Sequence, residues 1–307
     1  MLESEPETAV VIDLTSGDTG EATVAPAQLT FTALNWTVAQ TVTVTGVDDG
    51  SLVDGDVPTT ITVSVDDASS DAAYDALSDQ FVTVTTIDGD VAGYSVVESG
   101  GTTTVSEASG TDVFTVVLTA QPLTNVVFDV TSGDTGEATV IPSQLTFTNA
   151  NWNTAQTVTV SGVDDGLLLD GDQTTTVTVG INVIGSNDAF DALAPETVSV
   201  TTTDDEVAGF TITASSPTVD ETGTTDNFTV VLDVQPMSNV VLTVVSADIG
   251  EVTVAPATLT FTMATWNAPQ TVTLTGVGDS PLLDGDQNTL VTVAVDDANS
   301  YDPFDAV

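Results

Sequence analysis

The chain has 307 residues, 46 of them Asp or Glu, and no Lys, Arg, His or Cys, which gives a formal charge of −46 at pH 7. Without basic side chains there is no phosphate clamp, no nucleic-acid footprint and no attraction to anionic lipid. Without His or Cys, His-based acid–base catalysis, thiol nucleophiles, zinc sites and disulfides are excluded. Two carboxylates about 4 Å apart repel by about 4 kcal/mol at an effective dielectric of about 20, so we expect cations from solution to supply the counter-charge.

The first residues, Met1–Glu7, have neither a basic region nor an apolar core, so we expect no signal peptide there. No apolar run approaches the roughly 18 residues of a membrane span, so we expect no membrane insertion.

The sequence repeats with a period of about 115 residues, marked by Trp36, Trp152 and Trp266. Each Trp lies between Leu-Thr-Phe-Thr and Gln-Thr-Val-Thr, and Asp-Gly-Asp recurs at 54–56, 170–172 and 284–286. A period of this length indicates a row of independent domains. We predict repeat 1 at 1–90, repeat 2 at 91–206 and repeat 3 at 207–307.

Only repeat 2 contains the whole pattern. Aligned with it, repeat 1 lacks the first strands and repeat 3 lacks the last. One interpretation is that the sequence is a window on a longer array. The other is that neighbouring repeats or identical subunits donate the missing strands.

Small hydroxyl and β-branched residues alternate within each repeat, as in Thr157-Val-Thr-Val160, which is typical of half-buried strands. In repeat 2 the pattern predicts strands over 92–105, 112–119, 125–131, 137–148 (broken at Pro142), 156–163, 173–183 and 196–203. Seven short strands at this spacing indicate an all-β fold of tandem immunoglobulin-like antiparallel sandwiches in an elongated array. We interpret the aromatic residues as packing residues: Phe114, Phe128, Phe147 and Trp152.

The acids of repeat 2 fall on connections that an antiparallel arrangement brings to one end of the sandwich. Loops 120–124 and 149–154, which belong to the other end, carry none. We call the first end the acidic pole. Its members are Glu107, Asp134, Asp164, Asp165, Asp170, Asp172, Asp204, Asp205 and Glu206.

The partial repeats follow the same pattern. Repeat 1 places Asp18, Asp48, Asp49, Asp54, Asp56, Asp88 and Asp90 at its pole. Repeat 3 places there Asp220, Glu221, Asp248, Asp279, Asp284 and Asp286.

Carboxylates grouped in this way favour Ca²⁺, which takes six to eight oxygens at flexible geometry, over Mg²⁺, which requires a strict octahedron. Gly166 and Gly171 let the backbone bend so that carbonyl oxygens take part. The alternative is that Asp and Gly simply populate turns. The Asp-Gly-Asp triplet fits neither an EF-hand nor an RTX repeat.

Taken together, these motifs resemble Calx-β domains, the Ca²⁺-binding modules of sodium–calcium exchangers, integrin β4 and large bacterial surface proteins. The resemblance rests on an early Glu, Phe-Thr-Val-Val-Leu, Leu-Thr-Phe, Gln-Thr-Val-Thr-Val, an acidic loop and a terminal acidic cluster. It spans all of repeat 2 and the parts present of the other two. Gly278 replaces the acid at the position of Asp164, and Asp stands where the family often has Glu. The resemblance implies Ca²⁺ ligation by Glu107, Asp134, Asp164, Asp165, Asp170, Asp172, Asp204 and Asp205.

A second acidic set belongs to the opposite pole. We hypothesise that it faces the acidic pole of the preceding repeat and that Ca²⁺ fixes the joint there. The alternative is a solvated turn anchored by Tyr74, Phe190 or Phe304. The set comprises Asp66, Asp67, Asp71, Asp75, Asp188, Asp191, Asp296, Asp297, Asp302 and Asp305.

These features favour an extracellular structural or adhesive stalk or fibre at a cell surface, rigidified by several Ca²⁺ ions. The alternative is a Ca²⁺-sensing regulatory module of a larger protein. We do not expect an enzyme, because a two-carboxylate hydrolase needs one differentiated cleft rather than acids repeated at every pole. Halophilic adaptation would enrich the surface in acids without aligning them into poles.

Overall fold

Repeat 2 contains the complete sandwich in the computed structural model, which describes residues 1–278 and 285–307. One sheet has the order β13 (Ala138–Ile141), β15 (Gln156–Gly162), β10 (Thr111–Leu118) and β8 (Tyr94–Glu98). The other has the order β14 (Gln144–Phe147), β12 (Val126–Ser132), β17 (Gln173–Ile181), β18 (Glu196–Thr203) and β9 (Thr103–Ser106). The predicted all-β, immunoglobulin-like fold is confirmed.

Two of the predicted strands are in fact pairs of strands that cross between the sheets. The range 92–105 divides into β8 and β9 around a turn in which Gly100 and Gly101 have positive φ. β8 pairs antiparallel with β10, whereas β9 pairs parallel with β18. The range 137–148 divides at Pro142, so that β13 pairs with β15 and β14 with β12. Treating 92–105 as one strand was wrong, because its glycines allow a bend that a continuous strand excludes.

The core of repeat 2 lies between the two sheets and is made mainly of Val and Phe side chains, whereas most Thr side chains of the strands are at least partly exposed. Phe114, Phe128 and Phe147 are fully buried, and Trp152 packs against them from the rim. The rings of Phe128 and Phe147 meet edge to face, with centroids 5.9 Å apart. The aromatic residues therefore have the packing role predicted for them.

Repeat 1 forms a four-stranded sheet and a two-stranded sheet. The first has the order β3 (Gln28–Phe31), β1 (Val10–Ser16), β6 (Val57–Val65) and β7 (Gln80–Thr86); the second pairs β2 (Ala22–Ala25) with β4 (Thr43–Gly46). Strands equivalent to β8, β9 and β10 are not among those described. Val82 on β7 is consequently 52% exposed, whereas Val198 at the same position of β18 is 1% exposed.

Repeat 3 has two sheets as well. One contains β19 (Phe210–Thr213), β20 (Thr225–Leu232), β25 (Gln270–Gly276) and β23 (Val252–Ala255), in that order. The other contains β24 (Thr258–Phe261), β22 (Val240–Ser246) and β26 (Val291–Val295). In the described residues no strand pairs with the outer edge of β26, the edge that β18 covers on β17 in repeat 2.

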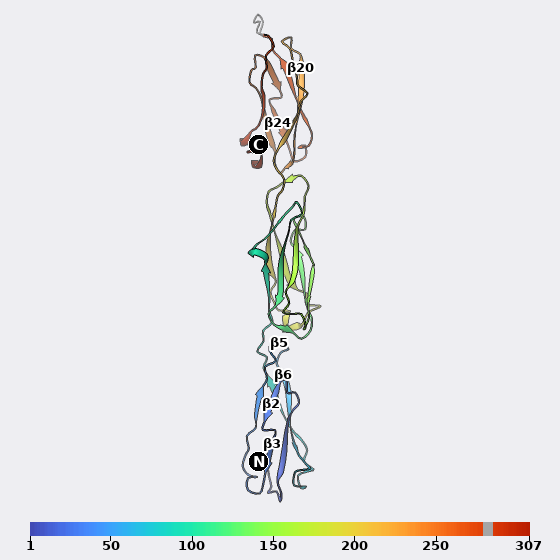
Figure 1. The fold of residues 1–307 in the computed structure, drawn as a ribbon, viewed down its shortest axis with the longest axis vertical. Coiled ribbons are helices and arrows are strands. Elements are labelled where there is room, and N and C mark those ends of the chain that lie inside the picture. The colour runs from blue at the N-terminus through green and yellow to red at the C-terminus, as the bar shows by residue number, and fades with distance from the viewer. Residues whose placement is uncertain (279–284) are drawn as a thin grey trace.

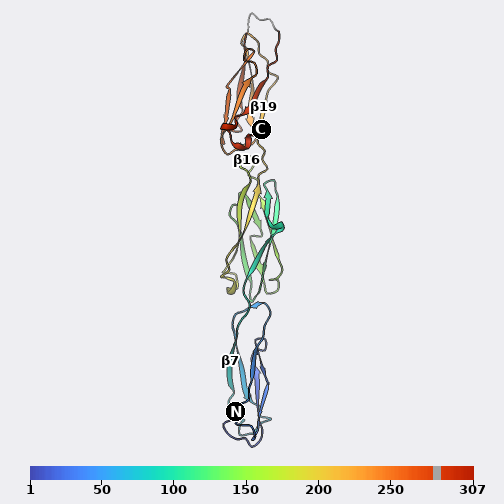
Figure 2. The same cartoon turned by 90° about the vertical axis from the view of Figure 1, so that its left-hand side faces the viewer.

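The three sandwiches lie end to end in one narrow rod (Figures 1 and 2). Short parallel bridges occur at the two joints, between β5 (Leu52–Val53) and β11 (Gln121–Pro122) and between β16 (Leu168–Leu169) and β21 (Gln235–Pro236). The helical segments of the described chain are the 3-10 turns η1 (Ser99–Gly101), η2 (Asp188–Phe190), η3 (Asp297–Asn299) and η4 (Asp302–Phe304). Among the described residues, no helix has the length and apolar character needed to cross a membrane.

Candidate metal centre

The acidic pole of repeat 2 is built from four separate connections. These are the β9–β10 loop, the β12–β13 loop, the β15–β17 loop and the segment after β18. Carboxylate oxygens of Glu107, Asp205 and Glu206 lie within 4.8 Å of one another, although they come from opposite ends of the repeat. The strand order of the sandwich brings them together.

Glycine allows the β9–β10 loop to pack closely enough to place Glu107 in the pole. A Cβ on Gly162, at the end of β15, would lie 2.3 Å from the Ser106 carbonyl oxygen, and a Cβ on Gly110 would lie 2.4 Å from the Ser106 nitrogen. Both distances are far below van der Waals contact. The Glu107 backbone nitrogen donates to the Thr203 carbonyl at 3.2 Å, which ties the loop to the end of β18.

Glu107 is the most deeply buried acid at this pole. Its side chain is 2% exposed, and its Oε2 is buried without a hydrogen-bond partner. Burial, followed by the charges of Asp165 and Asp204, raises the pKa of Glu107 to about 7. Leaving such an oxygen without a donor or a cation is costly, because a buried charge needs compensation.

Three further acids at the pole share this condition. Glu137 Oε2, Asp170 Oδ1 and Glu206 Oε2 are also buried without a partner. Burial first, and then the neighbouring acids, raises the pKa of Glu206 to about 7 and that of Glu137 above its ordinary value. The pole thus presents several buried oxygens that lack protein donors.

Asp204 holds the β15–β17 loop, residues 163–172, which we call the tip loop. Asp204 Oδ2 accepts from the Gly171 nitrogen at 2.7 Å, and Asp172 Oδ1 accepts from the Asp204 nitrogen at 3.2 Å. Asp164 Oδ1 accepts from the Gly166 nitrogen at 2.7 Å. Part of the predicted ligand set therefore also stabilises turns.

Glu137 is a pole residue that the sequence prediction does not include. The Thr-Gly-Glu motif marks the repeat, but the prediction assigns Asp134 as the acid of that loop. Asp134 Oδ1 accepts from the Gly136 nitrogen at 2.8 Å and the residue is exposed, so its main contact is a turn. Glu137 is fixed instead by its carbonyl, which accepts from the Val163 nitrogen at 3.0 Å and the Thr202 hydroxyl at 3.2 Å. Its place at the start of β13, one turn beyond Asp134, is the signal that would have identified it.

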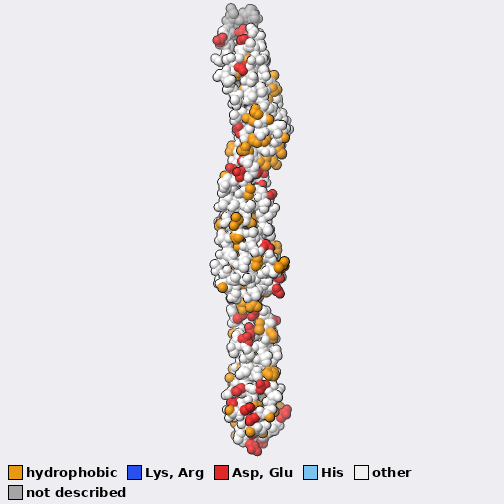
Figure 3. Space-filling view, turned by 90° about the vertical axis from the view of Figure 1, so that its right-hand side faces the viewer, with side chains coloured by type: hydrophobic (Ala, Val, Ile, Leu, Met, Phe, Trp, Pro, Cys, Tyr) orange, Lys and Arg blue, Asp and Glu red, His pale blue; other side chains and the backbone are white. Residues whose placement is uncertain are grey.

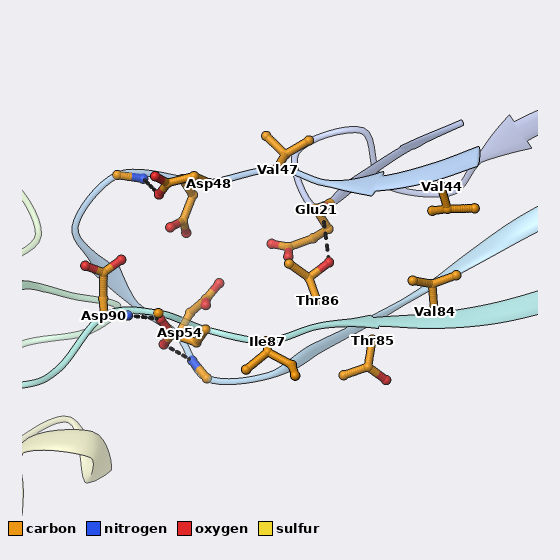
Figure 4. Close-up of a pocket in the computed structure, with 16 residues that line it drawn as sticks. Glu21, Val44, Val47, Asp48, Asp54, Val84, Thr85, Thr86, Ile87 and Asp90 are labelled. Carbon is orange, nitrogen blue, oxygen red and sulfur yellow. Dashed lines mark hydrogen bonds between the residues drawn. The ribbon is translucent and has the colours of Figure 1, made fainter. Parts of the chain in front are cut away.

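Repeat 1 also gathers carboxylates at its pole, but in different groups, because it has no equivalent of Glu107 and has Gly89 at the position of Asp205. Carboxylate oxygens of Glu21, Asp49 and Asp54 lie within 4.8 Å of one another, as do those of Asp48, Asp49 and Asp90. In Figure 4 the side chains of Glu21, Asp48, Asp54 and Asp90 converge from separate segments on one space.

The convergence space in repeat 1 has a volume of about 570 Å³. A liquid water molecule occupies about 30 Å³, so the cavity has room for more than one cation with its remaining waters. Asp88 is equivalent to Asp204 and makes the same hydrogen bond, because its Oδ2 accepts from the Gly55 nitrogen at 2.8 Å. Asp56 Oδ1 accepts from the Asp88 nitrogen at 3.2 Å, and Asp18 Oδ1 from the Gly20 nitrogen at 2.9 Å.

Repeat 3 brings Asp220, Glu221, Glu251 and Asp286 to the lining of one cavity. Hydrogen bonds from Thr222 and Thr224 hold the pKa of Asp220 below its ordinary value. Asp248 Oδ1 accepts from the Gly250 nitrogen at 2.8 Å, as its equivalents do in the other repeats. The predicted ligands Asp279 and Asp284 lie outside the described residues.

Acids of the second set, at the opposite poles, are largely engaged in turns. Asp71 accepts backbone hydrogen bonds from Ala73, Thr8 and Glu7, which hold its pKa below the ordinary value. Asp66 accepts from the Ala68 nitrogen, and Asp296 from the Asn299 amide. Phe190, Phe304 and Tyr74 are buried beside them. These contacts favour the anchored turn over a built cation site, with Asp191 Oδ1 the buried oxygen left without a partner.

The chemistry of the acidic pole is restricted to oxygen donors, since the chain has no His or Cys. Red acidic side chains gather near the joints and at one end of the rod, with no blue basic surface beside them (Figure 3). Carboxylates on bendable loops suit a hard divalent cation with many oxygen ligands. The residues present therefore fit Ca²⁺.

No protein-family model and no curated protein matches the chain. Among solved structures, domains 4 and 5 of the S-layer protein SbsC match with 18% identity and a TM-score of 0.28, covering 62% of this chain and 70% of that one. CBD12 from CALX1.2 matches with 14% identity and a TM-score of 0.27, over 68% of this chain and 84% of that one. The calcium binding domain CBD12 of CALX1.1 matches with 16% identity and a TM-score of 0.25, over 60% of this chain and 76% of that one. With similarity this low, the functional inferences below rest on the residues of the chain itself.

Proposed function

We propose that the chain forms an extracellular structural or adhesive stalk at a cell surface, whose tandem sandwiches bind several Ca²⁺ ions at their acidic poles. The observation that carries this proposal is the buried, unpartnered Oε2 of Glu107 beside Asp205 and Glu206. No basic side chain exists that could neutralise this cluster. A cation supplies both the missing charge and the missing partner.

The residues that would hold Ca²⁺ in repeat 2 are Glu107, Glu137, Asp165, Asp170, Asp205 and Glu206. Oxygen-only coordination from separate loops favours Ca²⁺ over zinc, which takes nitrogen and sulfur, and over Mg²⁺, which tolerates less distortion. Extracellular Ca²⁺-binding modules work at Kd values of about 10⁻⁴–10⁻³ M, which suits several sites of this kind outside the cell. A row of like sites favours a stiff stalk over a single sensing module.

A thermal melt in EGTA, then with excess Ca²⁺, tests the proposal. Binding to the native state alone stabilises by about 2.7 kcal/mol per site at a hundredfold excess over Kd. We expect Ca²⁺ to raise the melting temperature strongly and Mg²⁺ to raise it weakly. An unchanged melting temperature with Ca²⁺ would overturn the calcium function. Small-angle scattering in both solutions then separates a rod that stiffens from a sensor that bends at one joint.

We further propose that the partners of the stalk are neighbouring repeats and identical subunits, by addition of strands to open sheet edges. β7 is the terminal strand of its sheet, and its neighbouring side chains Phe81 and Val82, which point to opposite faces, are 65% and 52% exposed, which supports this. Exposed edges of this kind accept an extra strand. Sedimentation velocity at rising protein concentration tests it: concentration-dependent assembly supports subunit donation, and a monomer at all concentrations contradicts it.

A further inference from the structure

The two joints of the rod are made by the same two positions of the tip loop, which is residues 163–172 in repeat 2 and the equivalent residues 47–56 in repeat 1. Leu52 and Val53 pair in parallel with Gln121 and Pro122 of the following sandwich. Leu168 and Leu169 pair with Gln235 and Pro236 in the same register. Backbone hydrogen bonds of 2.6 Å close both bridges, from the Gln121 nitrogen to the Ser51 carbonyl and from the Gln235 nitrogen to the Leu167 carbonyl.

The tip loops of repeats 1 and 2 each contribute a side chain to the core of the next sandwich. Val53 is 7% exposed and belongs to the apolar core of repeat 2, whereas Leu169 is 6% exposed and belongs to that of repeat 3. Leu167, two residues earlier in the same loop, is 53% exposed. Burial is therefore specific to the position that enters the neighbour, and the core of a repeat is completed by the repeat before it.

Acids of the pole stand on both sides of this inserted side chain. In repeat 2, Asp164 and Asp165 precede the tip, and Asp170 and Asp172 follow it. The two arms of the loop therefore carry like charges and repel each other when ionised. A cation held between the arms replaces this repulsion by attraction and fixes the loop that carries Leu169.

The receiving sandwich approaches the same acids from the other side. Burial first, and then the charges of Asp170 and Asp204, raises the pKa of Tyr301, which packs against the core of repeat 3. The charges of Asp170 and Asp204 in repeat 2 therefore act on the phenol group of Tyr301 in repeat 3. The joint consists of a buried aliphatic tip and a backbone bridge, both next to the candidate cation centre.

We propose that the tip loop couples cation binding in one repeat to the stability of the next, so that Ca²⁺ at the pole of one repeat stabilises the repeat that follows it and the folded neighbour in turn tightens that Ca²⁺ site. This inference rests on the proposed Ca²⁺ function of the pole. It assigns Val53 and Leu169 as the coupling residues and the apolar end of the next sandwich as their receptor. Repeat 1 is thereby coupled to repeat 2, and repeat 2 to repeat 3.

The single Trp of each repeat makes this testable in the intact chain. With Trp36 and Trp152 replaced by Phe, the fluorescence of Trp266 reports the unfolding of repeat 3; with Trp36 and Trp266 replaced, Trp152 reports repeat 2. We expect Leu169→Ala to lower the Trp266 transition by about 10 °C and to change the Trp152 transition much less. Leu167→Ala, the matched control in the same loop, is expected to change neither.

Hydrogen exchange followed by mass spectrometry on chains with all three Trp residues gives the same comparison without the Trp substitutions. Faster exchange in β20, β22 and β25 of the Leu169→Ala chain supports the coupling. Exchange that rises only within repeat 2, or equally in both Leu variants, contradicts it.

The role of the cation is tested by a double-variant cycle. Glu107→Gln with Glu206→Gln is expected to reduce the Ca²⁺-induced rise of the Trp266 transition when Leu169 is present, and to have no further effect on it in the Leu169→Ala chain. Equal effects in both backgrounds would overturn the coupling through Leu169.

Calorimetric titration with Ca²⁺ separates the two proposals. Ca²⁺ binding with a Trp266 transition insensitive to Leu169 contradicts the coupling and leaves the Ca²⁺ function standing. Absence of Ca²⁺ binding overturns both, whatever Leu169→Ala does to the stability of repeat 3.

Discussion

Glu107 and Glu206 come from the two ends of repeat 2, yet their carboxylate oxygens lie within 4.8 Å of each other and of Asp205. Each has a buried oxygen without a partner, and burial is the largest cause that raises each pKa to about 7. A pair of this kind opposes folding when both groups are ionised and assists it when a cation lies between them. The stability of the pole therefore depends on pH and on metal together.

The first prediction concerns pH in the absence of metal. The pKa of Glu107 rises from 4.5 in the unfolded chain to about 7 in the folded one, so the folded state holds its proton more tightly. The stability that the more tightly held proton contributes is fully present below pH 4.5 and is lost as the pH rises to about 7. We expect the melting temperature in EGTA to fall across this window. Melts at a series of pH values measure it, and a rising melting temperature across the window would contradict the burial of these groups.

With saturating Ca²⁺ the same pH window should show the opposite trend. Metal binds the ionised carboxylates and competes with the proton, so Ca²⁺ affinity and the stability it confers rise as the pH approaches about 7. Binding at the lower end of the window should release protons. Calorimetry in buffers of different ionisation enthalpy measures this release, and heats that do not depend on the buffer would count against it.

The third prediction concerns Glu107→Gln. Gln keeps the size of the side chain and removes the charge that Glu107 carries above pH about 7, so the metal-free protein should become more stable in that range. The same substitution removes a proposed ligand, so the stabilisation by Ca²⁺ should shrink. Melts of repeat 2, followed through Trp152, measure both effects. Glu196→Gln, an exposed acid at the opposite end of the sandwich, is the control. A loss of stability in EGTA would contradict the first expectation.

The fourth prediction uses Gly162 and its equivalent Gly46. A Cβ at Gly162 would lie 2.3 Å from the Ser106 carbonyl and must displace the β9–β10 loop that carries Glu107. A Cβ at Gly46 meets only Thr86 Cγ2 at 3.6 Å, an ordinary contact. We expect Gly162→Ala to weaken Ca²⁺ binding in repeat 2 and Gly46→Ala to leave binding in repeat 1 unchanged. Calcium titrations of the two variants measure this, and equal affinities would show that the loop does not position a ligand.

The fifth prediction concerns the two equivalent valines of β18 and β7. Val198→Ala removes two buried carbons, which should cost repeat 2 about 1.6 kcal/mol. Val82→Ala in repeat 1 should cost little, because Val82 is already 52% exposed. Chemical unfolding of both variants measures the difference. A large cost at Val82 would show that its face is covered in solution.

Much of the fold followed from local pattern. The alternation of Val and Thr predicted the strands of repeat 2, because alternate side chains of a strand face opposite sides of the sheet. The prediction failed where a strand changes sheets, at Gly100 and Gly101. Both sides of that bend show the same alternation, so the sequence contains no mark of which sheet each half joins.

The candidate site was predicted in part. The connections that carry Glu107, Asp165 and Asp204 do meet at one end, which follows from antiparallel order alone. Asp134 and Glu137 lie within one turn of each other, and only the direction of each side chain makes one a turn acid and the other a buried one. The coupling through Val53 and Leu169 had no counterpart in the prediction, because two apolar residues in an acidic loop have no local partner.

Composition and spacing by themselves determined that the chain is a row of β-sandwiches without internal counter-charge, since these properties depend on residue type and period alone. Tertiary structure decided which carboxylates are buried without partners, and that the tip of one repeat completes the core of the next. Burial and contact between distant segments depend on how the sheets close and stack. That arrangement is a property of the packed chain, and no single segment of the sequence contains it.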